Sequence, residues 1–194
     1  MTPFKSEWTA LACHPTAVSG AVRGVDIRLA REASGSLTLR YVLRAHMLHV
    51  RIPPMAAPAR ADGLWAHTCF EAFIAPAAAG VAYYELNFSP SRQWAIYSFE
   101  AYRQGMSPTD VTVPPQLTVR AFDDRLELDA TFGLDGLKDL RAAHTLKLAV
   151  SAVVEDDSGT LSYWALKHAP GKPDFHHGDG FVLELPARPL GQPK

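Results

Sequence analysis

Two stretches of the chain decide its fold: LWAHTCFE at residues 64–71 and YELNFSPSRQW at residues 84–94. Both combine the patterning of β-strands with large aromatic side chains and charged or amide groups. The polar members are Glu71, Glu85, Asn87 and Arg92. A buried charge is costly unless it is paired or meets a ligand. We therefore expect two adjacent strands that carry these groups to one binding site.

Alternation of apolar and polar residues extends well beyond these two stretches. Apolar side chains recur at every second position in residues 25–29 and 37–43, with Ser34-Gly35-Ser36 as a turn between them. A period of two is typical of strands with one buried face. The alternation changes phase near residues 45–47, which predicts a break or a β-bulge there.

Further strands are expected at short intervals along the chain. They are residues 68–74, 82–88, 94–102, 116–122, 125–132, 145–154, 161–166 and 181–185. Asp123-Asp124 and residues 156–159 have the composition of tight hairpin turns. Only residues 134–143 resemble a helix. The pattern predicts an all-β fold, an antiparallel β-sandwich of the jelly-roll or immunoglobulin-like type, with one short helix near residues 134–143.

The composition fits one domain and disfavours several classes of partner. With 194 residues, of which 47% are hydrophobic, the chain can bury a sizeable core. We expect a single domain at residues 1–186 and a flexible tail at 187–194, which contains Pro189 and Pro193. A formal net charge of -1 provides no basic surface for nucleic acid.

The sequence predicts a cytoplasmic protein that does not bind membranes. No run of about 18 apolar residues could span a bilayer. Residues 1–9 contain Lys5 and Glu7 in place of the apolar core of a signal peptide. Cys13 and Cys69 are too few for a disulfide framework, so each is expected to be a small buried hydrophobe.

Two tryptophans beside polar residues are candidates for stacking on a ligand. Trp65 lies at a loop-strand junction before the first polar strand, and Trp164 lies within a strand near the C-terminus, shortly before His168. An indole stacks well on the C–H face of a sugar ring, while nearby polar groups satisfy its hydroxyls. Glu71 and Arg92 could bind a diol or simply pair with each other. Alternatively, both tryptophans belong to the core of the sandwich.

The segment 168–177 contains three histidines and an aspartate: His168, Asp174, His176 and His177. Imidazole and carboxylate groups bind zinc, so a metal-dependent hydrolase is one alternative. The spacing matches no zinc signature, and the chain has no nucleophile elbow, phosphate-binding loop or dinucleotide fingerprint. A proline-framed loop ordered by its own hydrogen bonds also explains these residues. We expect no metal and no cofactor.

From about Leu64 to Leu185 the chain resembles a DOMON-like domain of a bacterial single-domain subgroup. This group of β-sandwiches is related to family 9 carbohydrate-binding modules and to haem- or sugar-binding DOMON domains. The matching motifs are residues 64–73, residues 84–90 with Trp94 and Phe99, residues 102–106 and residues 172–177.

The resemblance implies binding of a saccharide or glycoside without catalysis. It places a sugar end unit between Trp65 and Trp164, with Glu71 and Arg92 on its hydroxyls. Glu85, Asn87 and His168 complete the expected set of ligand-binding residues.

Two departures from the family pattern bear on this expectation. The carbohydrate-binding modules carry an acidic residue three positions before the glutamate, where this chain has Thr68. Those modules are also exported parts of polysaccharide-degrading enzymes, whereas we expect this chain to be cytoplasmic and without a catalytic partner. The haem proteins of the group use methionine and histidine as axial ligands, and the candidates are Met47, Met55, His46, His49 and His168. Because their spacing identifies no pair, haem binding stays an alternative beside metal-dependent hydrolysis.

Overall fold

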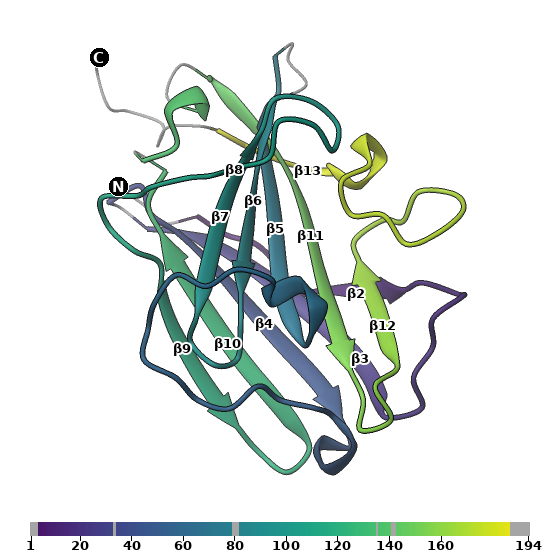
Figure 1. Ribbon diagram of the computed structural model, residues 1–194. Helices are drawn as coiled ribbons and strands as arrows, with labels where there is room; N and C mark the ends of the chain where they lie inside the picture. The colour runs from purple at the N-terminus through teal and green to yellow at the C-terminus, as the bar shows by residue number, and fades with distance from the viewer. Residues whose placement is uncertain (1–3, 33, 79–81, 135, 141–142, 187–194) are drawn as a thin grey trace.

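The computed structural model describes residues 4–32, 34–78, 82–134, 136–140 and 143–186. Antiparallel strands form one sheet that curls over, so that its two halves pack face to face as a sandwich (Figure 1). The first half contains β1 (Phe4–Lys5), β2 (Thr9–Cys13), β3 (Val22–Arg31), β4 (Leu37–Ala45), β9 (Gln116–Ala121) and β10 (Arg125–Phe132). The predicted antiparallel β-sandwich is confirmed.

The second half of the sandwich contains the strands of the two polar stretches, residues 64–71 and 84–94. Its strands are β5 (Cys69–Pro76), β6 (Tyr83–Phe88), β7 (Trp94–Phe99), β8 (Ser107–Pro108), β11 (Thr145–Glu155), β12 (Leu161–Ala165) and β13 (Leu183–Pro186). A short pairing of β12 with β2 joins the two halves. β5 and β6 are direct neighbours, as the sequence predicts.

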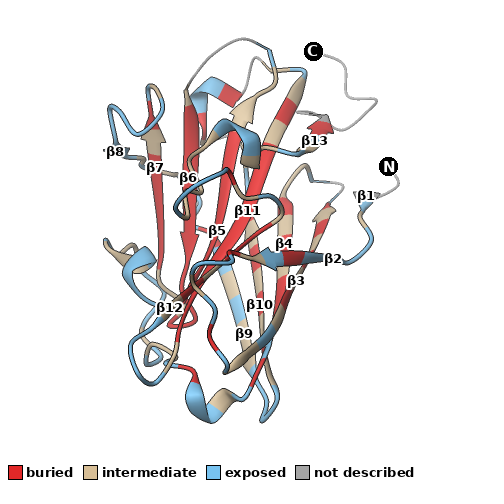
Figure 2. Ribbon diagram, turned by 90° about the vertical axis from the view of Figure 1, so that its right-hand side faces the viewer, coloured by how far each residue is buried: buried red, intermediate tan, exposed pale blue. Residues whose placement is uncertain are grey.

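The two halves differ in how their outer faces meet solvent. Buried and half-buried residues alternate along β3 and β10, so one face packs inward and the other faces water. Every residue of β6 is buried, and all but the last two of β5 are (Figure 2). Segments outside the sheet must therefore cover the outer face of β5 and β6, and these segments build the candidate site.

One-turn helices occur at two places where the sequence predicted a break in a strand or a longer helix. The phase change near residues 45–47 corresponds to the 3-10 helix η1 (Met47–His49), which follows β4. The helix expected at 134–143 is reduced to the single turn η3 (Lys138–Leu140), although residues 135, 141 and 142 lie outside the described part. No helix in the described ranges is long and apolar enough to cross a membrane.

The strand β2, the C-terminal tail and the two cysteines differ in how they compare with the sequence-based expectations. β2 was not expected, because only Leu11 of its five residues is buried and the alternation is therefore faint. The tail expected at 187–194 lies outside the described residues. Cys69 is buried, Cys13 is half-buried, and both are free thiols.

Candidate functional site

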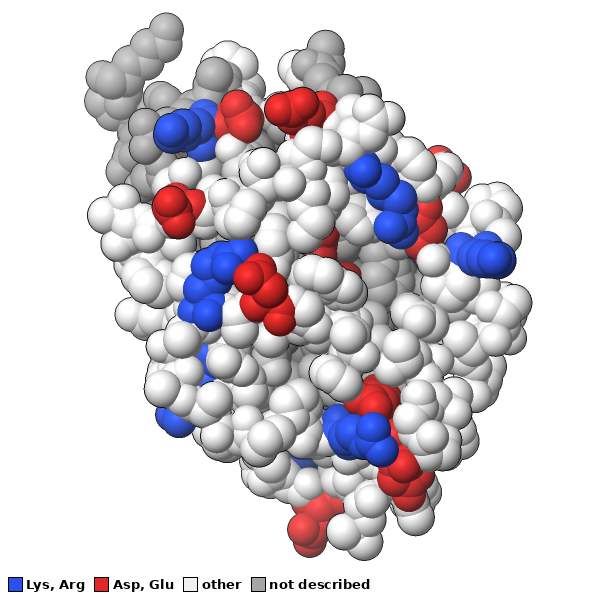
Figure 3. Space-filling view, in the orientation of Figure 1, with Lys and Arg blue, Asp and Glu red and all other residues white. Residues whose placement is uncertain are grey.

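A pocket of about 460 Å³ lies on the outer face of the second half of the sandwich. Strands β5, β6, β7, β11 and β12 contribute its floor, and the loops at residues 63–66, 103–106 and 173–176 form its walls. On this side of the molecule, charged side chains stand mostly in pairs of opposite sign around a largely uncharged middle (Figure 3). The pocket is therefore a mainly apolar hollow with a few polar groups, which is typical of small-molecule sites.

Two glutamates from neighbouring strands form the polar floor of the pocket. Glu71 on β5 is opposite Asn87 on β6, and Glu85 is opposite Phe73, so the glutamates are diagonal neighbours on one face. Only 3% of Glu71 and 5% of Glu85 is exposed. Burial and the charge of Glu85 raise the pKa of Glu71 well above its ordinary value. The pair therefore holds a proton more readily than two solvated carboxylates do.

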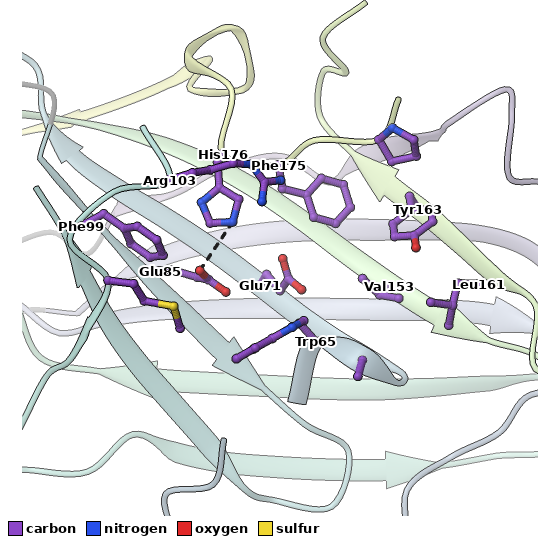
Figure 4. A pocket seen from close by; sticks show the side chains of 13 residues that line it. Trp65, Glu71, Glu85, Phe99, Arg103, Val153, Leu161, Tyr163, Phe175 and His176 are labelled. Carbon is purple, nitrogen blue, oxygen red and sulfur yellow. Dashed lines mark ion pairs between the residues drawn. The ribbon is translucent and has the colours of Figure 1, made fainter. Parts of the chain in front are cut away.

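Glu85 has more partners than Glu71. The amide of Asn87 donates to Glu85 Oε1 at 2.9 Å, and His176 Nε2 lies 3.8 Å from Oε2 (Figure 4). Burial raises the pKa of Glu85, while Asn87 and Arg103 oppose that shift. The Glu71 carboxylate accepts a 3.4 Å hydrogen bond from the Ser151 hydroxyl. Glu85 is therefore the better stabilised carboxylate of the two.

His176 connects Glu85 to a short hydrogen-bonded chain. The backbone N–H of Arg103 donates to the Tyr83 hydroxyl at 3.2 Å, and that oxygen lies 2.8 Å from His176 Nδ1. Burial and the charge of Arg103 lower the pKa of His176 to about 4. The ring is thus neutral near pH 7. If Nδ1 accepts the Tyr83 proton, Nε2 carries the hydrogen and presents it to Glu85.

Trp65 forms one wall of the pocket and is 39% exposed. It belongs to η2 (Leu64–Ala66), which begins after Gly63, a residue in the left-handed region at φ 73°. The indole meets the ring of Tyr97 edge to face at 5.6 Å between centroids. The Tyr97 hydroxyl donates to Asp62, so the indole rests on a side chain that is itself fixed.

The opposite wall comes from two loops that are tied together. Arg103 Nη2 donates to Asp174 Oδ1 at 2.8 Å, and the Tyr102 hydroxyl donates to the same carboxylate. Gly105 lies at φ 66°, where an added Cβ would come within 2.7 Å of Glu100. In Figure 4, Phe175 and His176 lie on the other side of the two glutamates from Trp65.

Three of the residues predicted from the sequence line this pocket: Trp65, Glu71 and Glu85. Asn87 is fully buried and supports Glu85 from the same face of β6. The structure therefore brings together four of the seven expected residues, and all four come from the two stretches at 64–71 and 84–94.

Trp164 does not share the pocket with Trp65, so the expected clamp of two tryptophans is wrong. Its side chain packs in the main core with only 8% of the residue exposed. The indole Nε1 donates to the Ser162 hydroxyl at 3.0 Å, so the polar neighbour satisfies Trp164 instead of a ligand. The alternative that this tryptophan belongs to the core is the one the structure shows.

Arg92 and His168 also lie away from the pocket lining. Arg92 occupies the turn between β6 and β7 at φ 75° and donates to the Ala56 carbonyl at 3.0 Å. His168 Nε2 bonds to the Ala12 carbonyl at 2.8 Å, and its ring stands edge-on to His14. Each side chain is held by a backbone carbonyl from a distant segment of the chain, Ala56 for Arg92 and Ala12 for His168.

Sequence reasoning missed the groups that loops and β12 bring to the pocket. The guanidinium at the site is that of Arg103, and the aromatic groups besides Trp65 include Tyr163 and Phe175. Arg103 and Phe175 do stand in the motifs 102–106 and 172–177 that carried the family resemblance. Those motifs were therefore the available signal for these two residues.

The histidine-rich segment does not gather its side chains around one point. His176 faces Glu85, whereas His177 accepts a hydrogen bond from the backbone of Asp179. Asp174 binds Arg103 and Tyr102. Within the described ranges, no three histidine, cysteine or acidic side chains lie close enough to hold a metal ion. Where it is described, the segment serves as a wall of the pocket.

Among the comparisons with known proteins, only the comparison of structures found similar proteins. No family model matches the chain, and no curated protein matches its sequence. The structure of a candidate carbohydrate-binding protein from Bacteroides uniformis aligns with a TM-score of 0.68 and 16% identity, covering 93% of this chain and 85% of that one. The β-sandwich fold is thus shared with that protein.

A family 9 carbohydrate-binding module from Caldicellulosiruptor kristjanssonii is also similar, in two structures at 10% identity. The complex with glucose has a TM-score of 0.49 and covers 85% of this chain and 76% of the module. The complex with cellotriose has a TM-score of 0.48 and covers 85% of this chain and 74% of the module.

Proposed function

We propose that the pocket binds a saccharide, or a comparable small polyhydroxylated molecule, without changing it chemically. The observation that carries this proposal is the placement of the half-exposed Trp65 beside the buried carboxylates of Glu71 and Glu85. Sugars present an apolar C–H face and a rim of hydroxyls, so they suit an aromatic wall over hydrogen-bond acceptors.

The dimensions and the walls of the pocket support a small ligand. A volume of about 460 Å³ lies within the range of ligand sites. Trp65 and Phe175 both line the cavity and lie on opposite sides of the carboxylates (Figure 4). In place of two tryptophans, the proposed clamp therefore consists of Trp65 and Phe175.

The Bacteroides protein that shares the fold is described as a candidate carbohydrate-binding protein, which agrees with this proposal. We also propose that the chain belongs with the DOMON-like β-sandwiches. The basis is the set of motifs at 64–73, 84–90, 102–106 and 172–177, all four of which contribute residues to the pocket lining.

A calorimetric titration with a panel of mono- and oligosaccharides tests the proposed function. We expect at least one member to bind with a dissociation constant in the millimolar range or tighter and in one-to-one stoichiometry. If every member fails to bind at millimolar concentration while the protein is folded, the saccharide proposal is wrong. Release of a reducing end or an aglycone during the titration would contradict the non-catalytic part.

A further inference from the structure

We infer that the ligand of this pocket carries a protonated amine, so that the site selects amino sugars over the corresponding neutral sugars. This inference rests on the proposed saccharide function and makes its ligand class more specific. It comes from the balance of charge inside the pocket.

The carboxylates of the pocket outnumber the cations that are available to them. Glu71 and Glu85 both line the cavity. Among the described residues, its lining includes one lysine or arginine side chain, that of Arg103. Asp174 already holds that guanidinium at 2.8 Å. Arg103 and Asp174 together contribute no net charge, so little positive charge in the lining opposes the glutamate pair. Without a ligand the pair holds a proton more readily than solvated carboxylates do, and a bound cation favours ionisation of both glutamates.

His176 does not supply the missing positive charge. It lies 3.8 Å from Glu85, but burial and the nearby Arg103 lower its pKa to about 4. At neutral pH the ring is uncharged, so it provides no positive charge beside Glu85. The remaining lining is mostly aromatic or aliphatic, which weakens dielectric screening and makes the like-charged pair costly without a cation.

The hydrogen-bonding capacity of Glu71 leads to the same ligand. An ionised carboxylate has about four acceptor positions and no donor. Of these, the Ser151 hydroxyl fills one, at 3.4 Å from Oε2. A ligand ammonium brings three donors and a positive charge, whereas a hydroxyl brings one donor. Charge-assisted hydrogen bonds are also roughly twice as strong as neutral ones.

The aromatic walls favour a cation as well. Trp65 and Phe175 line the same cavity as the two glutamates. A cation close to an indole face is attracted by the ring quadrupole, and tryptophan is the strongest such partner. Conversely, a sugar acid would bring a further carboxylate beside the glutamate pair, so the same groups disfavour anionic sugars.

Three ligands on one sugar skeleton test the inference: a hexose, the matching 2-amino hexose and its N-acetyl derivative. The series should be run with the gluco, galacto and manno forms at a pH where the amine is protonated. We expect the amino sugar to bind at least tenfold more tightly than the other two members of its series. The hexose replaces the ammonium by a hydroxyl of similar size, and the N-acetyl derivative keeps the nitrogen without its charge, so weaker binding of both isolates the effect of charge.

Site variants then connect the preference to the two carboxylates. In Glu71→Gln and in Glu85→Gln, the ratio of amino-sugar to neutral-sugar affinity should fall toward one. Asp123→Asn changes an exposed acid in the distant turn between β9 and β10 and should leave that ratio as it is. An unchanged ratio in both glutamate variants would overturn the inference.

The outcomes separate this inference from the proposed function. If a neutral sugar binds as tightly as its amino form, the amine inference is wrong and saccharide binding stands. If no member of any series binds at millimolar concentration, both are wrong.

Discussion

Tyr163 and Trp164 are consecutive residues of β12 whose side chains lie on opposite faces of the sheet. Tyr163 lines the candidate pocket, and Trp164 packs in the core. Because side chains alternate along a strand, only one of these two aromatic residues can reach a ligand on the outer face. This relationship places Tyr163 on the outer face, in the pocket lining, and Trp164 in the core.

Replacing Trp164 by alanine should destabilise the fold. The indole is buried in the main core and donates to Ser162, so the change leaves a cavity and removes one hydrogen bond to a buried hydroxyl. A loss of about 3–5 kcal/mol in the free energy of unfolding is typical of such truncations. Denaturant-induced unfolding measures it. A loss below about 1 kcal/mol would contradict the core placement.

Replacing Glu71 by glutamine should stabilise the protein at neutral pH in the absence of ligand. Burial and Glu85 raise the pKa of Glu71, so above that pKa the folded state bears a cost that the unfolded chain does not. This cost decreases as the pH falls from the folded pKa toward the ordinary value. Thermal unfolding should show a gain for Glu71→Gln that shrinks toward pH 5. A loss of stability near pH 7 would contradict the raised pKa.

His176 should make the stability depend on pH in the opposite sense. Its pKa is lowered from 6.5 to about 4, so below about pH 6.5 the unfolded chain binds a proton that the folded protein does not. Stability attributable to His176 is complete above pH 6.5 and decreases down to about pH 4, by on the order of 3 kcal/mol. Unfolding of the wild type and of His176→Gln at several pH values isolates this contribution, because the variant lacks it. Parallel pH profiles would show that the assignment is wrong.

Arginine-to-lysine changes at two positions should have different effects on ligand binding. Arg103 lines the pocket and is joined to Asp174, so Arg103→Lys should loosen the loops that form its wall. A loss of affinity of about three- to tenfold is the expected order of magnitude. Arg92→Lys should leave affinity unchanged, because Arg92 contacts the Ala56 carbonyl outside the pocket. Equal effects of the two changes would contradict this placement.

The fold could be predicted from the sequence to the extent that its signals are local. The period of two located β3, β4, β9 and β10, and the polar residues in two adjacent stretches placed Glu71 and Glu85 on one face. The positions of Arg103 and Phe175 depend on loops that pack against the sheet from far along the chain. That packing leaves no periodic signal.

The misplacement of Trp164 has a different physical cause. Alternation along residues 161–166 indicates two faces but does not say which one is buried. Ser162, a polar residue, shares the core-facing side with Trp164 and bonds to its indole and to the Val154 carbonyl. Polar residues near Trp164 in the sequence therefore do not show that the indole faces outward.

Titration of saccharides against Trp65→Ala and Trp8→Ala tests the central claim most directly. Both indoles are exposed to a similar degree, at 39% and 44%, but Trp8 stacks on Arg28 away from the pocket. The account predicts that Trp65→Ala weakens binding by about 1–3 kcal/mol, while Trp8→Ala binds like the wild type. Equal affinities of the wild type and Trp65→Ala for a bound saccharide would contradict it.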